Sequence, residues 1–383
     1  MFETSKIELS KSALKQNLAF INNRLKPNTK LCCVVKGNAY GHGLGSYVPM
    51  AMKLGVTYFA VHSADEAYHL VQACETKPDL FIMGSVDGDA ISWAVENGIE
   101  LAVFDFERLS LIIQNAKELN KKVKIHIEIE TGMWRTGFNL NQIQELIKVL
   151  IQHKEEVEFT GLFTHLAGAE SRANHFRIKE QLKIFKAAIA YLKDANLNPK
   201  FIHTACSAGI MNYPDAPGNM VRVGILQYGF WPNKETFIRF CNEVGSDMDV
   251  LKRVIRWTSS LMAISEVKSG NFIGYGTSFF AQKNMRIGIV PVGYSHGYNR
   301  NLSNVGSVLI NGKEAPIVGL VNMNSITVDL SNQPQVKKGD VVVLIGNQYK
   351  KSISVSSFSD QAHQLNYELL TRLPFKIPRI VKK

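Results

Sequence analysis

The 383-residue sequence contains no apolar run of the roughly 18 residues that a helix needs to cross a membrane. The start of the chain, Met1 to Ser10, also lacks the basic stretch and following apolar stretch of a secretory signal peptide. These two absences predict that the protein has no membrane partner and no signal peptide. We therefore expect a cytoplasmic location.

Cysteine is scarce and irregularly spaced. An odd number of cysteines with no metal-ligand spacing argues against both a disulfide framework and a zinc site. Two of the five are adjacent within an apolar run, which indicates reduced, buried thiols, and we expect no metal. The five residues are Cys32, Cys33, Cys74, Cys206 and Cys241.

Acidic residues are fewer than basic ones, 33 against 44, which leaves a formal charge of +11. Such a charge makes nucleic-acid binding an alternative to consider. The basic residues, however, form short scattered pairs such as Lys121-Lys122 and Lys337-Lys338, not a long stripe interleaved with aromatics. This distribution favours a solvated basic surface that attracts anionic small molecules, and we expect no nucleic-acid partner.

The first part of the chain alternates short apolar runs with amphipathic stretches, a pattern typical of βαβ units around a parallel sheet. Eight such units closing on themselves form a (β/α)8 barrel, and the count of eight favours a barrel over an open sheet. The expected helices include 64–74, 106–120, 141–153 and 178–195. The expected strands are 31–36, 58–62, 79–83, 100–104, 123–129, 158–164, 201–205 and 220–226.

The remainder of the chain has strand-like runs with little helix between them. Asn311-Gly312, between two of these runs, is a type I′ hairpin signal. We therefore predict an α/β protein with an N-terminal barrel domain, 1–240, and a mostly antiparallel β domain, 241–383. The expected strands of this second domain are 254–264, 285–292, 307–310, 315–321, 325–330 and 341–345.

Lys36 ends an apolar run and is followed at once by small, polar and glycine residues. A partly desolvated amine at the end of a strand is a candidate Schiff-base nucleophile, although a lone lysine there can simply be the solvated end of the strand. In a barrel, chemistry lies at the C-terminal ends of the strands. The residues expected at those ends are Lys36, Arg135, His165 and Ser207, with Arg222 and Gly224 within or just after the eighth strand.

The segment 34–43 reads Val-Val-Lys-Gly-Asn-Ala-Tyr-Gly-His-Gly. It resembles the signature of the alanine racemases, which are pyridoxal-phosphate (PLP) enzymes, and differs from the usual sequence of that signature only at Gly37. The resemblance implies that Lys36 holds PLP covalently and that Tyr40 hydrogen-bonds its phosphate. A barrel followed by a β domain is also the architecture of that family, so the resemblance covers essentially the whole chain.

Further barrel segments are similar to motifs of the same family. Taken alone, Arg135 would be a surface arginine and His165 a core histidine. By resemblance, the arginine of the segment 131–137 lies near the substrate carboxylate, and the histidine lies beside the second catalytic base. The family's remaining cofactor contacts would be made by Ser207, Arg222, Gly224 and Ile225, with Arg222 facing the pyridine nitrogen and the other three on the phosphate.

The second base is expected from the β domain. The segment 273–279 resembles the family's Tyr-Gly segment, and the segment 291–298 follows at the family spacing. Racemisation needs one base on each face of a planar intermediate, and the resemblance assigns these roles to Lys36 and Tyr275. It also places Tyr294 and Met323 at the substrate. In the family the tyrosine base and the methionine come from a partner subunit, so the resemblance implies a homodimer.

Several positions depart from the family pattern. Glu128 stands where many members have a carbamylated lysine, and Phe375 stands where a phosphate-binding tyrosine is expected. Asn324 and His296 each replace an aspartate, and Leu320 replaces an arginine. The catalytic set is intact whereas the substrate-facing set is not. The catalytic set therefore indicates racemisation, and the departures bear on which amino acid is the substrate.

We predict a PLP-dependent amino-acid racemase, an isomerase that acts on alanine by a two-base mechanism. A racemase of another small amino acid, such as serine, is one alternative. A decarboxylase or D-amino-acid aldolase of the same fold is another, although those families lack the continuation after Lys36 and the segment around Tyr275. A non-catalytic PLP carrier would be a barrel alone.

Overall fold

The computed structural model describes residues 3–355 and 366–383, and the chain divides into two compact units. The barrel unit comprises Leu14–Gly37 and Val48–Lys252. The β unit comprises Met1–Ala13, Asn38–Tyr47 and Arg253–Lys383.

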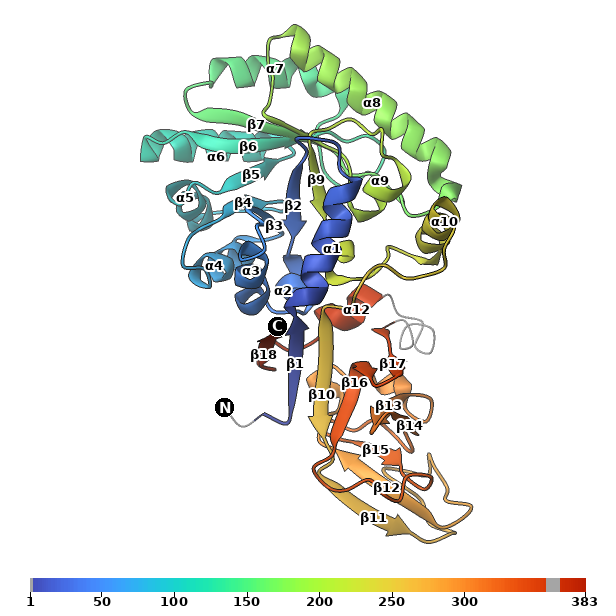
Figure 1. Ribbon diagram of the computed structural model, residues 1–383. Helices are drawn as coiled ribbons and strands as arrows, with labels where there is room; N and C mark the ends of the chain where they lie inside the picture. The colour runs from blue at the N-terminus through green and yellow to red at the C-terminus, as the bar shows by residue number, and fades with distance from the viewer. Residues whose placement is uncertain (1–2, 356–365) are drawn as a thin grey trace. The chain divides into compact units, whose positions relative to one another are not determined.

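Eight parallel strands form the sheet of the barrel unit, in the order β8-β7-β6-β5-β4-β3-β2-β9. Figure 1 labels β2 to β7 and β9 of this sheet. The β9 segment also donates hydrogen bonds to the β8 segment. The N–H groups of Asn219, just before β9, and of Arg222 donate to the carbonyls of Ile202 and of Ala205, just after β8, at 2.9 Å each. These contacts bring the sheet close to full closure and confirm the predicted barrel. The strands are β2 (Lys30–Val34), β3 (Tyr58–Val61), β4 (Asp79–Ile82), β5 (Glu100–Val103), β6 (Val123–Glu128), β7 (Val157–Phe163), β8 (Phe201–His203) and β9 (Met220–Val223).

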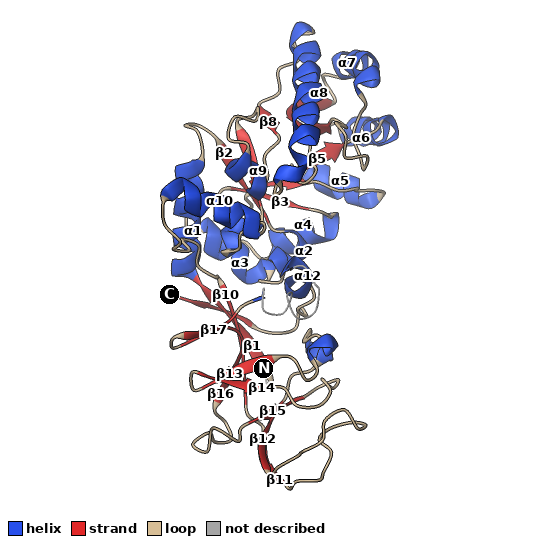
Figure 2. Ribbon diagram, turned by 90° about the vertical axis from the view of Figure 1, so that its right-hand side faces the viewer, coloured by secondary structure: helices blue, strands red, loops and turns tan. Residues whose placement is uncertain are grey.

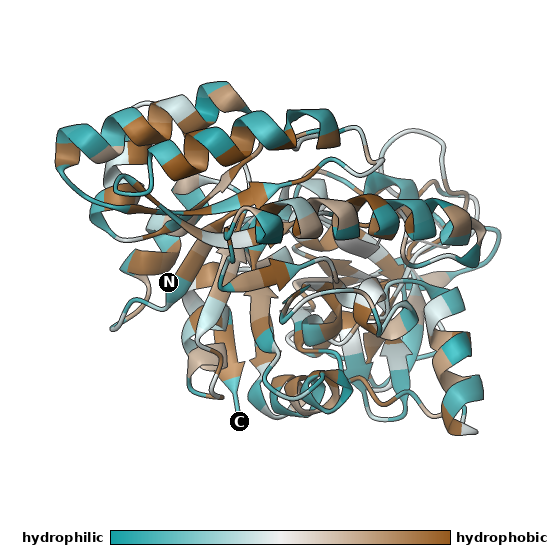
Figure 3. Ribbon diagram, turned by 90° about the horizontal axis from the view of Figure 1, so that it is seen from above, coloured by the Kyte–Doolittle hydropathy of each residue, from teal (hydrophilic) through white to brown (hydrophobic). Residues whose placement is uncertain are grey.

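Helices surround these strands, as Figure 2 shows. In α7 the buried residues Ile143, Leu146, Ile147 and Leu150 recur at helical spacing, which turns one apolar side toward the sheet. The brown and teal residues along the helices of Figure 3 reflect the same two-sided pattern. The helices are α1 (Lys11–Arg24), α3 (Leu44–Met52), α4 (Ala64–Gln72), α5 (Asp89–Glu96), α6 (Phe106–Leu119), α7 (Ile143–Gln152), α8 (His175–Asp194), α9 (Ser207–Asn212) and α10 (Lys234–Val244).

The β unit contains a seven-stranded sheet and a three-stranded sheet. Within the part of this unit that the structure describes, all strand pairs are antiparallel except β1 with β18, so the prediction of a mostly antiparallel domain is confirmed. Asn311 and Gly312 join β13 to β14 with φ of 49° and 77°, as a type I′ turn requires. The strands are β1 (Ser5–Ser10), β10 (Ile255–Ser260), β11 (Ala263–Val267), β12 (Met285–Val290), β13 (Ser307–Ile310), β14 (Lys313–Pro316), β15 (Ile326–Asp329), β16 (Val341–Gln348), β17 (Lys351–Ile353) and β18 (Arg379–Lys382).

The two units correspond only in part to the predicted domains, 1–240 and 241–383. Strand β1 belongs to the β unit because it pairs with β10, from Ser5 opposite Ser259 to Leu9 opposite Ile255. The segment 38–47 also belongs to the β unit, where the Gly41 carbonyl accepts a hydrogen bond of 2.9 Å from the Arg379 guanidinium. Both segments pair with chain that lies hundreds of residues away, which a reading along the sequence cannot detect.

Candidate active site

Lys36 follows the end of β2 and opens a short helical turn, α2 (Lys36–Tyr40). The four residues after the lysine all have positive φ, from 62° at Gly37 to 50° at Tyr40, so this turn is left-handed. Three of the four are not glycine, and such residues cost roughly 1–2 kcal/mol each in this conformation. The Gly37 N–H donates to Glu66 Oε1 at 2.5 Å, and this contact helps to fix the backbone beside the lysine. Strained backbone that is held in place by its surroundings is typical of functional sites.

The environment of the Lys36 amine favours its neutral form. Solvent reaches the side chain, but the surrounding protein removes much of the hydration of its ammonium group. This desolvation is the largest cause that lowers the pKa of Lys36, and the nearby Arg135 and Arg222 lower it further, against the opposing charge of Glu66. A lysine with a lowered pKa presents more of the unprotonated amine, which is the nucleophilic and basic form.

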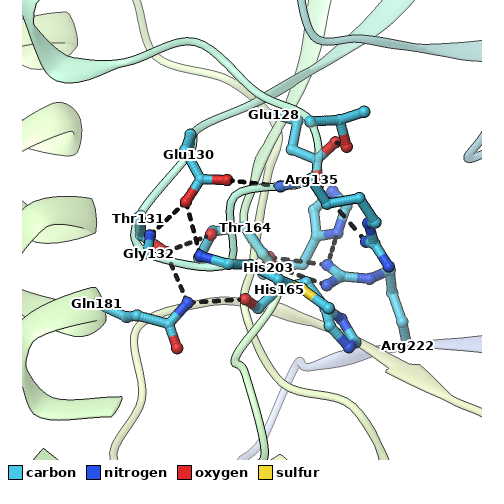
Figure 4. A network of polar contacts seen from close by, with 12 residues as sticks. Glu128, Glu130, Thr131, Gly132, Arg135, Thr164, His165, Gln181, His203 and Arg222 are labelled. Carbon is cyan, nitrogen blue, oxygen red and sulfur yellow. Dashed lines mark hydrogen bonds and ion pairs between the residues drawn. The ribbon is translucent and has the colours of Figure 1, made fainter. Parts of the chain in front are cut away.

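The loop that carries Arg135 is organised by Glu130 (Figure 4). The Glu130 carboxylate accepts hydrogen bonds from the backbone N–H groups of Gly132, of Met133 at 2.7 Å and of Arg135 at 3.3 Å. Burial alone would raise the pKa of Glu130, but these backbone donors outweigh it and hold the pKa below its usual value of 4.5. The carboxylate therefore fixes the loop backbone on which the exposed arginine stands.

Glu128 lies at the end of β6 and is buried, with 4% of its surface exposed. Its Oε1 is 3.9 Å from an Arg135 guanidinium nitrogen, and its Oε2 accepts a hydrogen bond of 2.7 Å from the Thr136 hydroxyl. Burial raises the pKa of Glu128, although Thr136 and Arg135 oppose the shift. The structure thus places a carboxyl group beside the arginine, at the position where the family often has a carbamylated lysine.

His165 follows β7, and its backbone is held by Gln181 of α8. The Gln181 amide donates to the His165 carbonyl and to the Thr131 hydroxyl at 3.0 Å each, so one side chain joins two loops of the barrel mouth (Figure 4). Burial lowers the pKa of His165 to about 3, and the cations Arg222, Arg135 and Lys36 add to this effect. The imidazole is consequently neutral near pH 7 and can accept or donate one hydrogen bond.

Arg222 lies on β9 and is 4% exposed. Its guanidinium donates to the Thr164 carbonyl at 2.7 Å, to the His203 carbonyl at 2.8 Å and to His203 Nδ1 (Figure 4). Burial lowers its pKa from 12.5, with Arg135 adding to the shift and Cys206, Cys32 and Glu128 opposing it. Among the residues that the structure describes, its Nε–H has no hydrogen-bond partner. Of the five N–H groups of the guanidinium, three make these bonds, so the Nε–H and one Nη2–H of a fixed arginine remain for a ligand.

Ser207 begins α9 and lies beside the turn that follows β9. Its hydroxyl oxygen accepts hydrogen bonds from the N–H groups of Gly224 at 3.1 Å and of Leu226 at 3.4 Å. Ile225 lies between these two residues and opens the short 3-10 helix η3 (Ile225–Tyr228). A hydroxyl and neighbouring backbone N–H groups are the donors that commonly bind a phosphate.

The remaining predicted residues lie in the β unit. Tyr275, Met323 and Tyr294 are 72%, 58% and 40% exposed. The backbone N–H groups of Tyr294 and Ser295 donate to the carbonyls of Asn322 and Met323 at 3.0 Å each, which places Tyr294 and Met323 on paired segments. Tyr40, the last residue of the left-handed turn, also belongs to this unit.

Some residues that shape the barrel mouth have no role in the sequence prediction. These are Glu66, Glu130, Gln181 and His203. Only Glu130 has a local signal, because a carboxylate directly before Thr131-Gly132 is well placed to cap the N–H groups of the following loop. Glu66 and Gln181 lie within helices, where the sequence indicates only a polar face.

A lysine with a lowered pKa, two arginines and a neutral histidine at one mouth of a parallel barrel are typical of a (β/α)8-barrel enzyme. The family model described as "Alanine racemase, N-terminal domain" matches residues 9–232, and the one described as "Alanine racemase, C-terminal domain" matches residues 254–381. An alanine racemase of Leptospira interrogans is 32% identical over 381 residues, which cover 99% of this chain and 96% of that protein. The chain therefore belongs to the alanine racemase family.

Solved structures agree with this assignment. An alanine racemase of Clostridium difficile 630 has a TM-score of 0.91 at 28% identity, with 100% of this chain and 96% of that chain covered. One from Bartonella henselae, described with covalently bound pyridoxal phosphate, has a TM-score of 0.84 at 27% identity and full coverage of both chains. The predicted family, fold and enzyme class, an amino-acid racemase and isomerase, are confirmed. The decarboxylase and aldolase alternatives are not favoured.

Across residues 3–355 and 366–383, no helix has the length and apolar character needed to cross a membrane. All five cysteines are free thiols, with Cys32 and Cys33 fully buried. Within the same described residues, no three His, Cys, Asp or Glu side chains are grouped so that they could hold a metal ion.

Proposed function

We propose that this alanine racemase family member interconverts L- and D-alanine with PLP held at Lys36, and that Lys36 and Tyr275 act as the two bases. The observation that carries the proposal is the Lys36 amine, whose pKa is lowered at a barrel mouth that also presents Arg135 and Arg222. The full-length relatives named alanine racemase support alanine as the substrate.

The residues at the mouth fit PLP in three respects. The Lys36 amine, with its lowered pKa, is suited to react with a carbonyl group. The Arg222 Nε–H, which has no partner among the described residues, suits a ring nitrogen that accepts a hydrogen bond. The Ser207 hydroxyl and the Ile225 N–H, together with the Tyr40 hydroxyl, would hold the phosphate, and the Gly224 N–H would join them once it is released from Ser207 Oγ.

When bound, PLP withdraws electrons from the substrate Cα and so makes its proton removable. Lys36 Nζ would take or return that proton on one face, and the Tyr275 hydroxyl would do so on the other. Arg135 would bind the substrate carboxylate through its guanidinium. Arg222 stays protonated because a guanidinium does not release its proton near neutral pH, so it donates a hydrogen bond without transferring charge.

His165 and the β-unit residues complete this assignment. The neutral His165 imidazole can accept a hydrogen bond from the Tyr275 hydroxyl and orient it. We propose that Tyr275 and Met323 reach the site from the partner of a homodimer, with Tyr294 near the substrate. Their exposure of 72% and 58% leaves both side chains accessible to a partner subunit, which this role requires.

The test combines two variants and one control. Lys36→Ala should lose both the visible absorbance of bound PLP and racemase activity. Tyr275→Phe keeps the ring without the acid–base group, so it should bind PLP and exchange the α-proton in deuterated water mainly from the enantiomer that Lys36 serves. Lys30→Ala, at the opposite end of β2, is the control, because its ammonium donates to Thr57 at 2.9 Å and should be irrelevant to PLP.

A fully active Lys36→Ala enzyme with an unchanged spectrum would contradict the proposed cofactor site. Equal exchange from both enantiomers at the wild-type rate in Tyr275→Phe would show that this tyrosine is not a base. Loss of optical activity should also be measured on a panel of L-amino acids. Activity on serine but not on alanine would reject alanine as the substrate.

A further inference from the structure

A chain of polar side chains crosses the apolar interior of the barrel. It starts at Arg222, whose guanidinium contacts His203 Nδ1. His203 Nε2 is 2.9 Å from His126 Nδ1, and His126 Nε2 is 2.5 Å from Glu100 Oε2. The Tyr58 hydroxyl donates to the same carboxylate oxygen. The five residues stand on five different strands, β9, β8, β6, β5 and β3.

The direction of every hydrogen bond in this chain follows from its two ends. A guanidinium has only donors, so Nδ1 of His203 must be the acceptor and its proton must lie on Nε2. That N–H donates to Nδ1 of His126, which leaves the His126 proton on Nε2. This second N–H donates to the Glu100 carboxylate, which can only accept when ionised. All of the N–H dipoles therefore point from the arginine toward the glutamate.

The surroundings keep the chain in this protonation state. His126 and His203 are fully buried, and burial lowers the pKa of both, to which Arg222 also contributes, so each imidazole is neutral. For Glu100, burial alone would raise the pKa, but the bonds from His126 and Tyr58 outweigh it and lower the pKa, so the carboxylate is ionised. The Phe81 ring stacks on the His126 imidazole with 4.3 Å between the ring centroids, which fixes the plane of the imidazole.

This chain of hydrogen bonds helps to balance the charge of the buried Arg222 guanidinium. A buried guanidinium is costly unless an anion balances it. Among the described residues, no carboxylate lies within ion-pair distance of Arg222, and the charge of Glu128 reaches it only at longer range. The two oriented imidazoles present a lone pair to the guanidinium and extend the influence of the Glu100 charge across the barrel. The chain also leaves the Nε–H of Arg222 unused.

We propose that Glu100 is a positioning residue for Arg222 and that it acts through His126 and His203. These two imidazoles form a relay in which every hydrogen bond is donated in the direction from Arg222 to Glu100. The relay holds the guanidinium with its Nε–H turned to the ligand and balances its charge from a distance. A carboxylate in direct contact would compete with the ligand for that N–H, whereas a remote one does not. The proposal rests on the proposed function, in which this N–H serves the PLP ring.

The first measurement uses wild-type apoprotein with 15N-labelled histidine. NMR should show that His126 and His203, identified by their loss in His126→Phe and His203→Phe, are neutral and protonated on Nε2 throughout pH 6–9. A proton on Nδ1 of either ring would overturn the relay. Because this measurement needs no PLP, it tests the relay even if the protein fails to bind PLP, an outcome that would instead reject the proposed function.

The second measurement compares Glu100→Gln, which removes the charge, with His126→Phe, which breaks the chain but keeps the stacking ring. The control is Ile112→Ala, a fully buried position on α6 that destabilises the barrel without touching the relay. The affinity of the apoprotein for PLP should fall about tenfold in both relay variants, a change of about 1.4 kcal/mol. The visible absorbance of bound PLP should shift, and kcat should fall with KM for alanine within about twofold.

The control should lose thermal stability while keeping the affinity for PLP. If both relay variants also lose only thermal stability, with unchanged PLP affinity, spectrum and kcat, the relay is a packing feature and the proposal is wrong. If Glu100→Gln behaves as wild type while His126→Phe does not, the histidines matter but the remote charge does not, and the role of Glu100 is likewise rejected.

Discussion

Replacement of Glu130 by glutamine should lower catalytic efficiency through Arg135. The carboxylate accepts three backbone N–H groups of the loop 131–137, and hydrogen bonds to a charged partner are worth about 1.5–3 kcal/mol each. Glutamine keeps one oxygen for Gly132 and Met133 but presents an NH2 group to the Arg135 N–H. Because one hydrogen bond is removed and two become weaker, we expect the ordered loop to be destabilised by about 2 kcal/mol, which corresponds to about a 30-fold fall in kcat/KM.

Initial rates with L- and D-alanine should show that most of this fall is a rise in KM, because Arg135 is proposed to bind the substrate carboxylate. Asp105→Ala is the matched control. It removes a carboxylate that accepts the Arg108 N–H at 2.8 Å and caps α6, so it should cost about 1 kcal/mol of stability with KM unchanged. Wild-type KM and kcat in Glu130→Gln would refute the reasoning.

The same residue predicts a pH effect on folding. The folded-state pKa of Glu130 lies below its usual value of 4.5, so its stabilising contribution is present above pH 4.5 and is lost as the pH falls through the folded-state pKa. Glu130→Gln has no such contribution to lose. Urea unfolding at pH 6 and at pH 3 should therefore show a smaller decrease in unfolding free energy for the variant than for wild type.

Two further substitutions test the departures from the family pattern. Glu128→Gln keeps an acceptor for Thr136 but removes the charge 3.9 Å from Arg135, so activity should fall. Removal of carbon dioxide at mildly acidic pH should leave the activity of the wild type unaffected. If the activity of Glu128→Gln is unchanged, Glu128 does not have this role. Phe375, which is 74% exposed, lacks the hydroxyl that the family uses on the phosphate. Phe375→Tyr should tighten PLP binding by up to about 1.5–3 kcal/mol and raise the ratio of activity on alanine to activity on serine. If neither property changes, this residue does not set specificity.

The barrel strands could be predicted because a parallel sheet covered on both faces leaves near-continuous apolar runs in the sequence. All four residues of β3, for example, are buried. Strand β1 escaped prediction because its parallel partner, β18, and its antiparallel partner, β10, both lie near the other end of the chain. The predicted site residues at the barrel mouth, such as Lys36 and Arg222, were found through motif resemblance to a known family.

The polar interior of the barrel could not be predicted, for a different reason. Glu100 and His126 lie in strands that read as apolar, and each is 5% exposed or less. Their partners are supplied by neighbouring strands, so no spacing along the chain links them. A glutamate within an apolar strand is unfavourable when it is buried without hydrogen-bond partners, and the sequence does not show any partner. The closed barrel supplies them, because His126 and Tyr58 both bond to the Glu100 carboxylate.

The barrel mouth balances its cations in two different ways, and this difference bears on what it can bind. Arg135 has a carboxylate at 3.9 Å, from Glu128, and a pair at that distance in partly exposed surroundings is weak enough to open toward a substrate carboxylate. Arg222 is buried and could not exchange a direct partner in the same way, because breaking a buried ion pair is expensive. Placing its counter-charge at Glu100, two imidazoles away, leaves the guanidinium fixed and its Nε–H available. In the proposed function, the arginine that binds substrate is thus loosely paired, whereas the arginine that faces PLP is fixed by hydrogen bonds to His203 and Thr164.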